Sequence, residues 1–215
     1  VDVANYLGSL VGLSEIGSRD RVILESIRFP RVAMGSLVGA ALAVSGAVMQ
    51  GLFRNPLADP GIIGVSAGAS LGAVSIIVLG ATVLQPLVTA FGVFALPMAA
   101  FCGALSVMLV LYGLSTRGGS TSIATLLLGG IALGAFAAAL TGVFVYIADD
   151  AQLRDLTFWS LGSLAGATWA KTYSITPVVI ATVLLSPFLA RGLDAIAMGE
   201  ATAHHVGISV QSFKR

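Results

Sequence analysis

The sequence predicts an all-α protein, a polytopic bundle of membrane-spanning helices. Hydrophobic residues make up 57% of the 215 residues, charged residues make up 10%, and the mean hydropathy is +0.98. This composition excludes an ordinary water-soluble domain. Long runs without a charged residue recur along the chain. Each is close to the ~20 residues that a helix needs to cross the hydrocarbon core.

The charge-free runs predict five spanning helices within a bundle that covers 31–190. They are approximately 32–53, 61–80, 91–114, 121–147 and 172–190. Residues 1–30 carry several charges and are predicted to lie outside the membrane. An odd number of spans places the two termini on opposite sides. The lysines and arginines divide almost evenly between the sides, so they do not orient the chain.

The first predicted span has small residues for close packing, and a polar turn follows it. Gly35 and Gly39 form a GxxxG step, which lets a neighbouring helix approach closely. In the turn, Asp59 is a good N-cap and Pro60 suits the first position of a helix. The chain is therefore expected to turn back into the bilayer after this point.

Several segments resemble the iron-chelate, heme and cobalamin permease family of bacterial ABC importers. They are RFPR (28–31), GAALAVSGAVMQGLFRNPLADPGIIGVSAGAS (39–70), LLLGGIALGA (126–135), FWSLGSLAG (158–166) and MGEATAHHVGI (198–208). The resemblance covers nearly everything from Arg28 onward. It implies a membrane bundle of the type II importer kind, with about five of the ten family spans present, and hence a truncated subunit.

The resemblance also implies an orientation and a location. It places 1–30 in the periplasm, a short periplasmic helix near 152–162, and cytoplasmic coupling helices in 191–215. The chain is then a multi-pass protein of the bacterial inner membrane, surrounded by lipid. The net charge of +1 gives no indication of nucleic-acid binding.

Three sets of residues carry roles that the resemblance implies. Arg28 and Arg31 would meet acidic residues of a periplasmic substrate-binding protein, although two arginines at a helix end can instead anchor lipid phosphates. The segment that would dock on the ATPase contains Gly199, Glu200, Ala203 and Gly207, the last suited to a left-handed cap. The candidate wall of the translocation pathway contains Gly130, Gly134, Ala138, Thr141 and Tyr146. Simple helix packing is an equally good explanation of these glycines.

The energy source is expected to lie outside this chain. Residues 61–116 and 118–148 contain no Asp, Glu, Lys, Arg or His, whereas a proton- or sodium-coupled carrier usually keeps such a group at membrane depth. No GxxxxGK[ST] phosphate-binding loop occurs in the sequence, so ATP and Mg²⁺ belong to a separate ATPase. No catalytic residue, cofactor or metal is assigned to the chain. Clustered His, Asp or Ser–His groups that would indicate a membrane enzyme are absent from the sequence.

Together with these observations, the family resemblance implies a permease that forms a homodimer, with a pair of ATPase subunits and one binding protein, and imports heme by alternating access. The similarity of 153–169 to heme permeases favours heme and thus iron transport. A ferric siderophore or cobalamin remains open. His204 and His205 are expected to face the ATPase or solvent rather than heme. The alternative from another class is a gradient-driven carrier or a channel.

Overall fold

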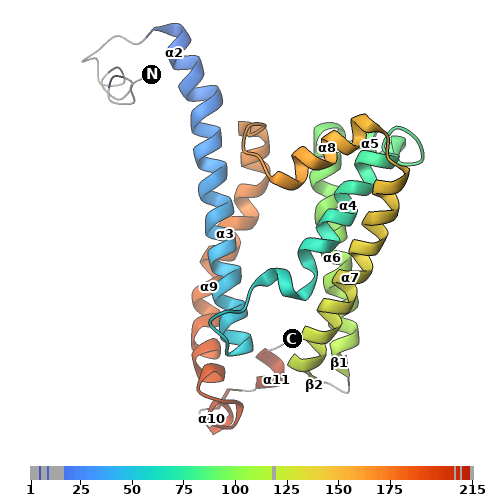
Figure 1. Cartoon of the computed structure of the whole chain (residues 1–215). Coiled ribbons are helices and arrows are strands. Elements are labelled where there is room, and N and C mark those ends of the chain that lie inside the picture. The colour runs from blue at the N-terminus through green and yellow to red at the C-terminus, as the bar shows by residue number, and fades with distance from the viewer. Residues whose placement is uncertain are drawn as a thin grey trace. The chain divides into compact units, whose positions relative to one another are not determined.

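A computed structural model describes residues 5, 9, 17–117, 120–205, 207–208 and 210–213. The packing of the backbone divides the chain into two units. One comprises 1–45 and 163–188, and the other comprises 46–162 and 189–215. Each unit is described by itself, and Figure 1 shows the elements of both.

Two long helices supply most of the first unit. The chain is helical from Ser18, through α2 (Ser18–Val22), a π-helical segment η1 (Ile23–Arg28) and α3 (Phe29–Phe53). The second long helix, α9, covers Trp169–Ala197 and contains Pro177 and Pro187. α3 and α9 both continue beyond the first unit into the residue ranges of the second.

Of the two glycines in the GxxxG step of α3, one has a close neighbour within the first unit. A methyl group added to Gly35 would come 3.2 Å from Cδ1 of Leu164, in the segment that precedes α9. A methyl group at Gly39 would meet nothing within 4 Å in the described residues. The contact at Gly35 is with one leucine side chain of a non-helical segment, so the described residues of the first unit do not show the close approach of a neighbouring helix that was predicted at this step.

The second unit is built on three apolar helices that pack side by side: α4 (Val65–Leu79), α6 (Ala95–Ser115) and α7 (Ile123–Ile147). The crossing of α4 and α6 brings backbone against backbone. A methyl group at Gly103 would overlap the carbonyl oxygen of Gly68, and one at Gly72 would overlap that of Ala99. Glycine is required here because any side chain would force the helices apart.

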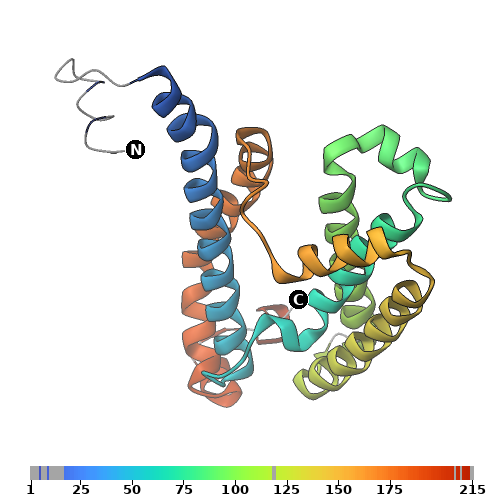
Figure 2. The same cartoon turned by 45° about the horizontal axis from the view of Figure 1, so that its top comes forward.

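Shorter elements connect and flank these helices. They are η2 (Pro60–Ile63, 3-10), α5 (Gln85–Phe91), η3 (Gly92–Phe94, 3-10), β1 (Thr116–Arg117), β2 (Ser120–Thr121), α8 (Asp150–Leu161), α10 (Glu200–His205) and α11 (Val210–Phe213). β1 and β2 pair antiparallel, with Thr116 opposite Thr121. α8 lies across one end of α4, as Figure 2 shows, and starts two residues before the short helix predicted near 152–162.

The predicted membrane bundle is confirmed as a helical fold, with one correction to the spans. Four described helical stretches are long and apolar enough to cross a membrane: Ser18–Phe53, Gln85–Ser115, Ile123–Ile147 and Trp169–Ala197. The span expected over 61–80 is instead a 3-10 turn followed by α4, which has only 15 residues. Gly64, with φ of +79°, separates the two, and a helix cannot continue through that conformation.

Two predicted boundaries also differ from the structure. The boundary expected between 30 and 31 is not a helix end, because the helix is continuous across it. α9 extends past 190 to Ala197, so 191–197 belongs to this helix and not to the coupling helices expected in 191–215. Most of 1–16 lies outside the described residues.

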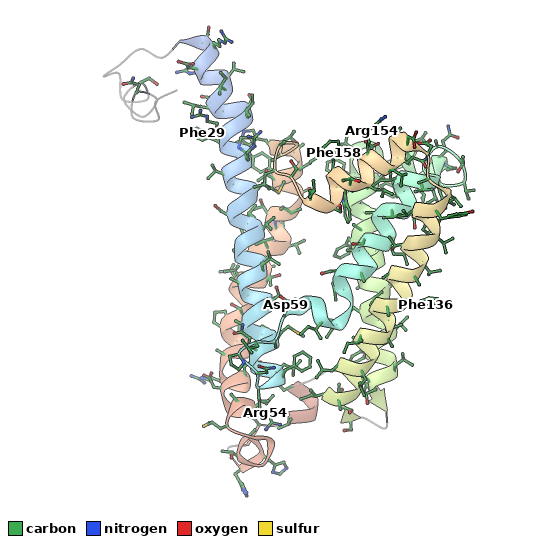
Figure 3. The ribbon with its side chains drawn as sticks, viewed as in Figure 1. Phe29, Arg54, Asp59, Phe136, Arg154 and Phe158 are labelled. Carbon is green, nitrogen blue, oxygen red and sulfur yellow. The ribbon has the colours of Figure 1, made fainter. Side chains whose placement is uncertain are left out.

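The polar turn after α3 confirms the predicted cap. The Asp59 side chain accepts a hydrogen bond from the backbone N–H of Gly61 at 2.6 Å, and Pro60 holds the first helical position. Figure 3 labels Asp59 in this turn. The capped element is a 3-10 helix of four residues rather than the start of a longer α-helix.

Candidate functional site

The predicted docking arginines lie at a change of helix type in the first unit. Arg28 is the last residue of the π-helical segment, and Arg31 lies in the first turn of α3. Both side chains are exposed. They are therefore accessible in this chain, as a docking role requires.

Pro30 explains why the helix changes type here. A proline inside a helix has no N–H to donate, and its ring crowds the carbonyl four residues earlier, which is that of Ser26. The N–H of Phe29 donates to the carbonyl of Leu24, five residues back, as in a π-helix. Trp169, at the start of α9, donates its Nε1–H to the carbonyl of Glu25 at 2.7 Å.

The predicted coupling segment is a compact turn after α9. Gly199 has φ of +116°, and Glu200 starts α10 directly after it. Gly207 has φ of +82° and donates its N–H to the carbonyl of His204 at 3.1 Å. The left-handed cap predicted at Gly207 is confirmed, while the docking role of the segment stays a prediction.

Ala203 lies inside this turn rather than on its surface. It is fully buried, in a cluster with Ala195, Ile196 and Val210. The ring of Phe213, in α11, lies where a methyl group of Gly192 would be, so α11 packs closely on the end of α9. Ala203 therefore supports the turn by packing, and a direct contact of its side chain with a partner is not available in this arrangement. His204 and His205 are exposed, as expected.

The candidate pathway wall on α7 divides into two groups. A methyl group at Gly130 would come 2.6 Å from Cα of Ile63, and one at Gly134 would come 3.5 Å from Cα of Gly64. These two glycines thus pack against the chain's own turn before α4. Ala138 and Tyr146 are exposed, Tyr146 to 89%.

Several other side chains of α7 are also exposed. Phe136, labelled in Figure 3, is 63% exposed. The exposed surface of α7, and not the face that carries the two glycines, is what remains to meet a substrate, lipid or another subunit.

Thr141 belongs to a small pocket that the sequence did not indicate. The pocket has a volume of about 290 Å³ and lies among α4, α7 and α8. Hydroxyl groups line it from all three helices: Ser70, Thr141, Thr157 and Ser160. Thr141 and Thr157 donate their protons to backbone carbonyls of their own helices, at 2.9 and 2.8 Å, so they present acceptor oxygens. Single hydroxyls spaced far apart in sequence give no signal that they converge.

The described residues contain no group of three or more His, Cys, Asp or Glu side chains placed to hold a metal ion. Long apolar helices, short polar turns and exposed arginines at a change of helix type thus define a multi-pass membrane protein. The model of the FecCD transport family matches residues 3–215. The chain belongs to this family.

Three relatives show which proteins the chain is similar to. It is 42% identical to the hemin transport system permease protein of Yersinia pestis, over 88% of this chain and 55% of that protein. It is 40% identical to the cobalamin import system permease protein of Halobacterium salinarum, over 91% and 50%. It is 38% identical to the vitamin B12 import system permease protein of Escherichia coli O6:H1, over 88% and 55%. The chain therefore spans about half the length of these relatives.

A solved structure has a similar fold. It is described as an inward-facing conformation of a metal-chelate type ABC transporter, and it superposes with a TM-score of 0.79 at 27% identity. The match covers 94% of this chain and 62% of that one. The likeness to a permease of an ABC importer, first indicated by the RFPR and MGEATAHHVGI segments, is confirmed by these comparisons.

Proposed function

We propose that this chain forms part of the permease subunit of an ATP-driven importer that carries heme across the bacterial inner membrane by alternating access. The observation that carries the proposal is the 42% identity to a hemin permease over 88% of the chain. The proposed assembly contains a second copy of the permease, a pair of ATPase subunits that bind ATP and Mg²⁺, and one periplasmic binding protein.

Cobalamin is the second candidate substrate. The two cobalamin or vitamin B12 permeases match at 40% and 38% identity, which is close to the value for the hemin permease. A ferric siderophore is a further candidate, since the structural relative is described as a metal-chelate type transporter. All three are metal chelates, so they imply the same mechanism.

In the proposed mechanism, ATP binding closes the ATPase pair, and α10 transmits that motion to the membrane helices. The exposed side chains of Met198, His204 and His205 on either side of the start of α10 support such a role, because a surface turn can enter a groove of a partner. Arg28 and Arg31 would contact acidic side chains of the binding protein through charge-assisted hydrogen bonds. The exposed surface of α7 around Ala138 and Tyr146 would line the substrate pathway between two permease copies.

The lack of ionisable residues inside the apolar helices argues against a gradient-driven carrier. The helices α4, α6 and α7 contain no Asp, Glu, Lys, Arg or His. A proton or sodium ion would therefore find no charged partner there. Energy supplied by ATP at the membrane surface requires no such partner.

Uptake into proteoliposomes tests the proposal. The complete complex, with its ATPase and binding protein, is offered heme, cobalamin and a ferric siderophore in parallel, each with and without ATP. We expect ATP-dependent uptake of heme. ATP-dependent uptake of another chelate would show that this chelate, and not heme, is the substrate, and would still support ATP-driven import. Uptake without ATP would contradict the importer and favour the carrier or channel.

A further inference from the structure

In the π-helical segment before α3, one backbone carbonyl would pair with a residue that has no N–H. In a π-helix, each carbonyl accepts from the N–H five residues later. The bond from Phe29 to the Leu24 carbonyl follows this rule. The next carbonyl along, that of Glu25, would pair with residue 30. That residue is Pro30, which has no N–H.

Trp169 donates to this same carbonyl from a distant part of the sequence. Its Nε1 lies 2.7 Å from the Glu25 oxygen, which is a short and well-formed hydrogen bond for an N–H donor. The indole ring is also fixed from its other side. It stacks on Tyr173, one turn along α9, with the ring centres 5.3 Å apart and an interplanar angle of 19°.

The bond itself is exposed, but two side chains of the turn beside it are not. Leu24 and Pro30 are both fully buried, although the chain on either side is largely exposed. Residue 30 offers no N–H to this carbonyl, so a donor from outside the helix has a clear physical role even though the bond lies at the surface. The indole N–H is such a donor.

We propose that Trp169 is a positioning residue: its indole N–H takes the place of the donor that Pro30 lacks, holds the π turn, and thereby sets the direction of Arg28 relative to Arg31. If the π turn relaxed to an α-helix, residues on its two sides would rotate relative to one another by about 100°, the rotation of one helical residue. Arg28 lies within the turn and Arg31 beyond it. Two guanidinium groups recognise a pair of carboxylates only when both directions are correct. The link to docking rests on the proposed function.

A double-mutant cycle with Pro30 tests the proposal. Trp169→Phe removes the N–H but keeps a ring that stacks on Tyr173. Pro30→Ala restores a backbone N–H at the position where it is missing. If the indole compensates for Pro30, Trp169→Phe has a large effect in the natural background and a small one in the Pro30→Ala background.

The measurements use the full-length permease with its ATPase in nanodiscs. Hydrogen exchange of the amides in 24–31 reports the π turn, and the Kd of the binding protein reports docking. We expect Trp169→Phe to speed exchange and raise the Kd by about two- to tenfold, as the loss of one hydrogen bond does. In the Pro30→Ala background, we expect changes of less than about twofold. Trp169→Phe removes the indole N–H signal of Trp169 from the NMR spectrum and so assigns it, and Trp159→Phe is the matched control.

Two results would overturn the proposal. One is an equal effect of Trp169→Phe on exchange in both backgrounds, which would mean that the indole does not compensate for Pro30. The other concerns docking. If Trp169→Phe speeds exchange but leaves the Kd of the binding protein unchanged, while the charge reversals Arg28→Glu and Arg31→Glu raise that Kd, then the π turn does not affect docking. If those reversals also leave the Kd unchanged, the proposed docking role of Arg28 and Arg31 is wrong. Hydrogen exchange alone then decides whether the indole of Trp169 compensates for Pro30.

Discussion

A single carboxylate organises the turn between α3 and α4. The Asp59 side chain accepts from the Gly61 N–H, and the Asn55 side chain accepts from the Leu57 N–H at 2.9 Å. The turn must satisfy its own backbone groups in this way, because it leaves one helix and enters another within a few residues. The direction in which α4 begins thus depends on two short polar side chains.

Replacing Asp59 should therefore destabilise this turn. We expect Asp59→Ala to lower the free energy of unfolding by about 1 kcal/mol, the usual cost of a lost N-cap. Asp59→Asn keeps an oxygen that can accept from Gly61 and should cost much less. Unfolding by denaturant in detergent micelles measures both. Equal losses for the two variants would show that the charge, and not the hydrogen bond, matters.

Among individual residues, the roles that depend on neighbours in the sequence could be predicted, and the contacts between distant segments could not. Asp59 before Pro60 follows from capping chemistry, and Gly207 follows from the need for a left-handed residue at a helix end. The hydrogen bond from Trp169 to Glu25 could not be predicted, because it joins segments 144 residues apart. The convergence of hydroxyls in the α4–α7–α8 pocket depends on tertiary packing in the same way.

Among the elements, α4 and α6 have the closest contact in the second unit. Gly68 and Gly72 face Ala99 and Gly103 with no side chain between the two backbones. Close backbone approach allows extensive van der Waals contact, which is the main attraction between helices in a lipid environment. Gly113 lies on the same helix as Gly103, but no atom of the described residues comes within 4 Å of its Cβ position.

Two alanine substitutions on α6 should therefore differ sharply. We expect Gly103→Ala to force α4 and α6 apart and to destabilise the protein by about 1–3 kcal/mol, the usual cost of overpacking. Gly113→Ala should be neutral or stabilising, since alanine favours helix more than glycine. Thermal unfolding in micelles compares them. An unchanged unfolding temperature for Gly103→Ala would mean that α4 and α6 lie farther apart than in the structure.

The side chain of Gln152 joins α8 to α4. Its oxygen accepts from the Asp149 N–H at 3.1 Å and completes a capping box, while its Nε2 donates to the Val78 carbonyl at 3.2 Å. The two ends of one amide thus serve two helices.

We expect Gln152→Glu to keep the cap but lose the bond to α4. The new carboxylate would face the Val78 carbonyl without a proton, at a cost of about 1–3 kcal/mol. Gln85→Glu adds the same charge at an exposed helix start and serves as the matched control. Hydrogen exchange of α8 amides is the measurement. Unchanged exchange in both variants would show that α8 does not depend on this bond.

The positions of the long helices could be predicted from charge-free runs alone, because lipid excludes charges along a whole span. The interruption at Gly64 could not. Gly64 packs against the backbone of Gly130, and a methyl group there would come 2.8 Å from the Gly130 carbonyl oxygen. Its left-handed conformation is therefore linked to a partner helix that the local sequence does not reveal.

For the whole molecule, the proposed coupling to an ATPase can be tested at the start of α10. We expect Glu200→Lys to leave the permease folded but to weaken its association with the ATPase, because it reverses a charge in the segment proposed to dock there. Co-purification of the ATPase and ATP-driven uptake are the measurements. His205→Gln, an exposed change on the same helix, is the control. Normal association and uptake by the Glu200→Lys variant would contradict the proposed docking site.

The glycine contacts of the second unit bear on how such a transporter can move. Helices separated by interdigitated side chains can slide, because rotamers readjust at each step. Where carbonyl oxygens meet glycine backbones, as between α4 and α6 and between α7 and the turn before α4, there is no side chain to readjust. Any conformational cycle should therefore shift these three helices together, and the hinges should lie in the segments that join them to their neighbours.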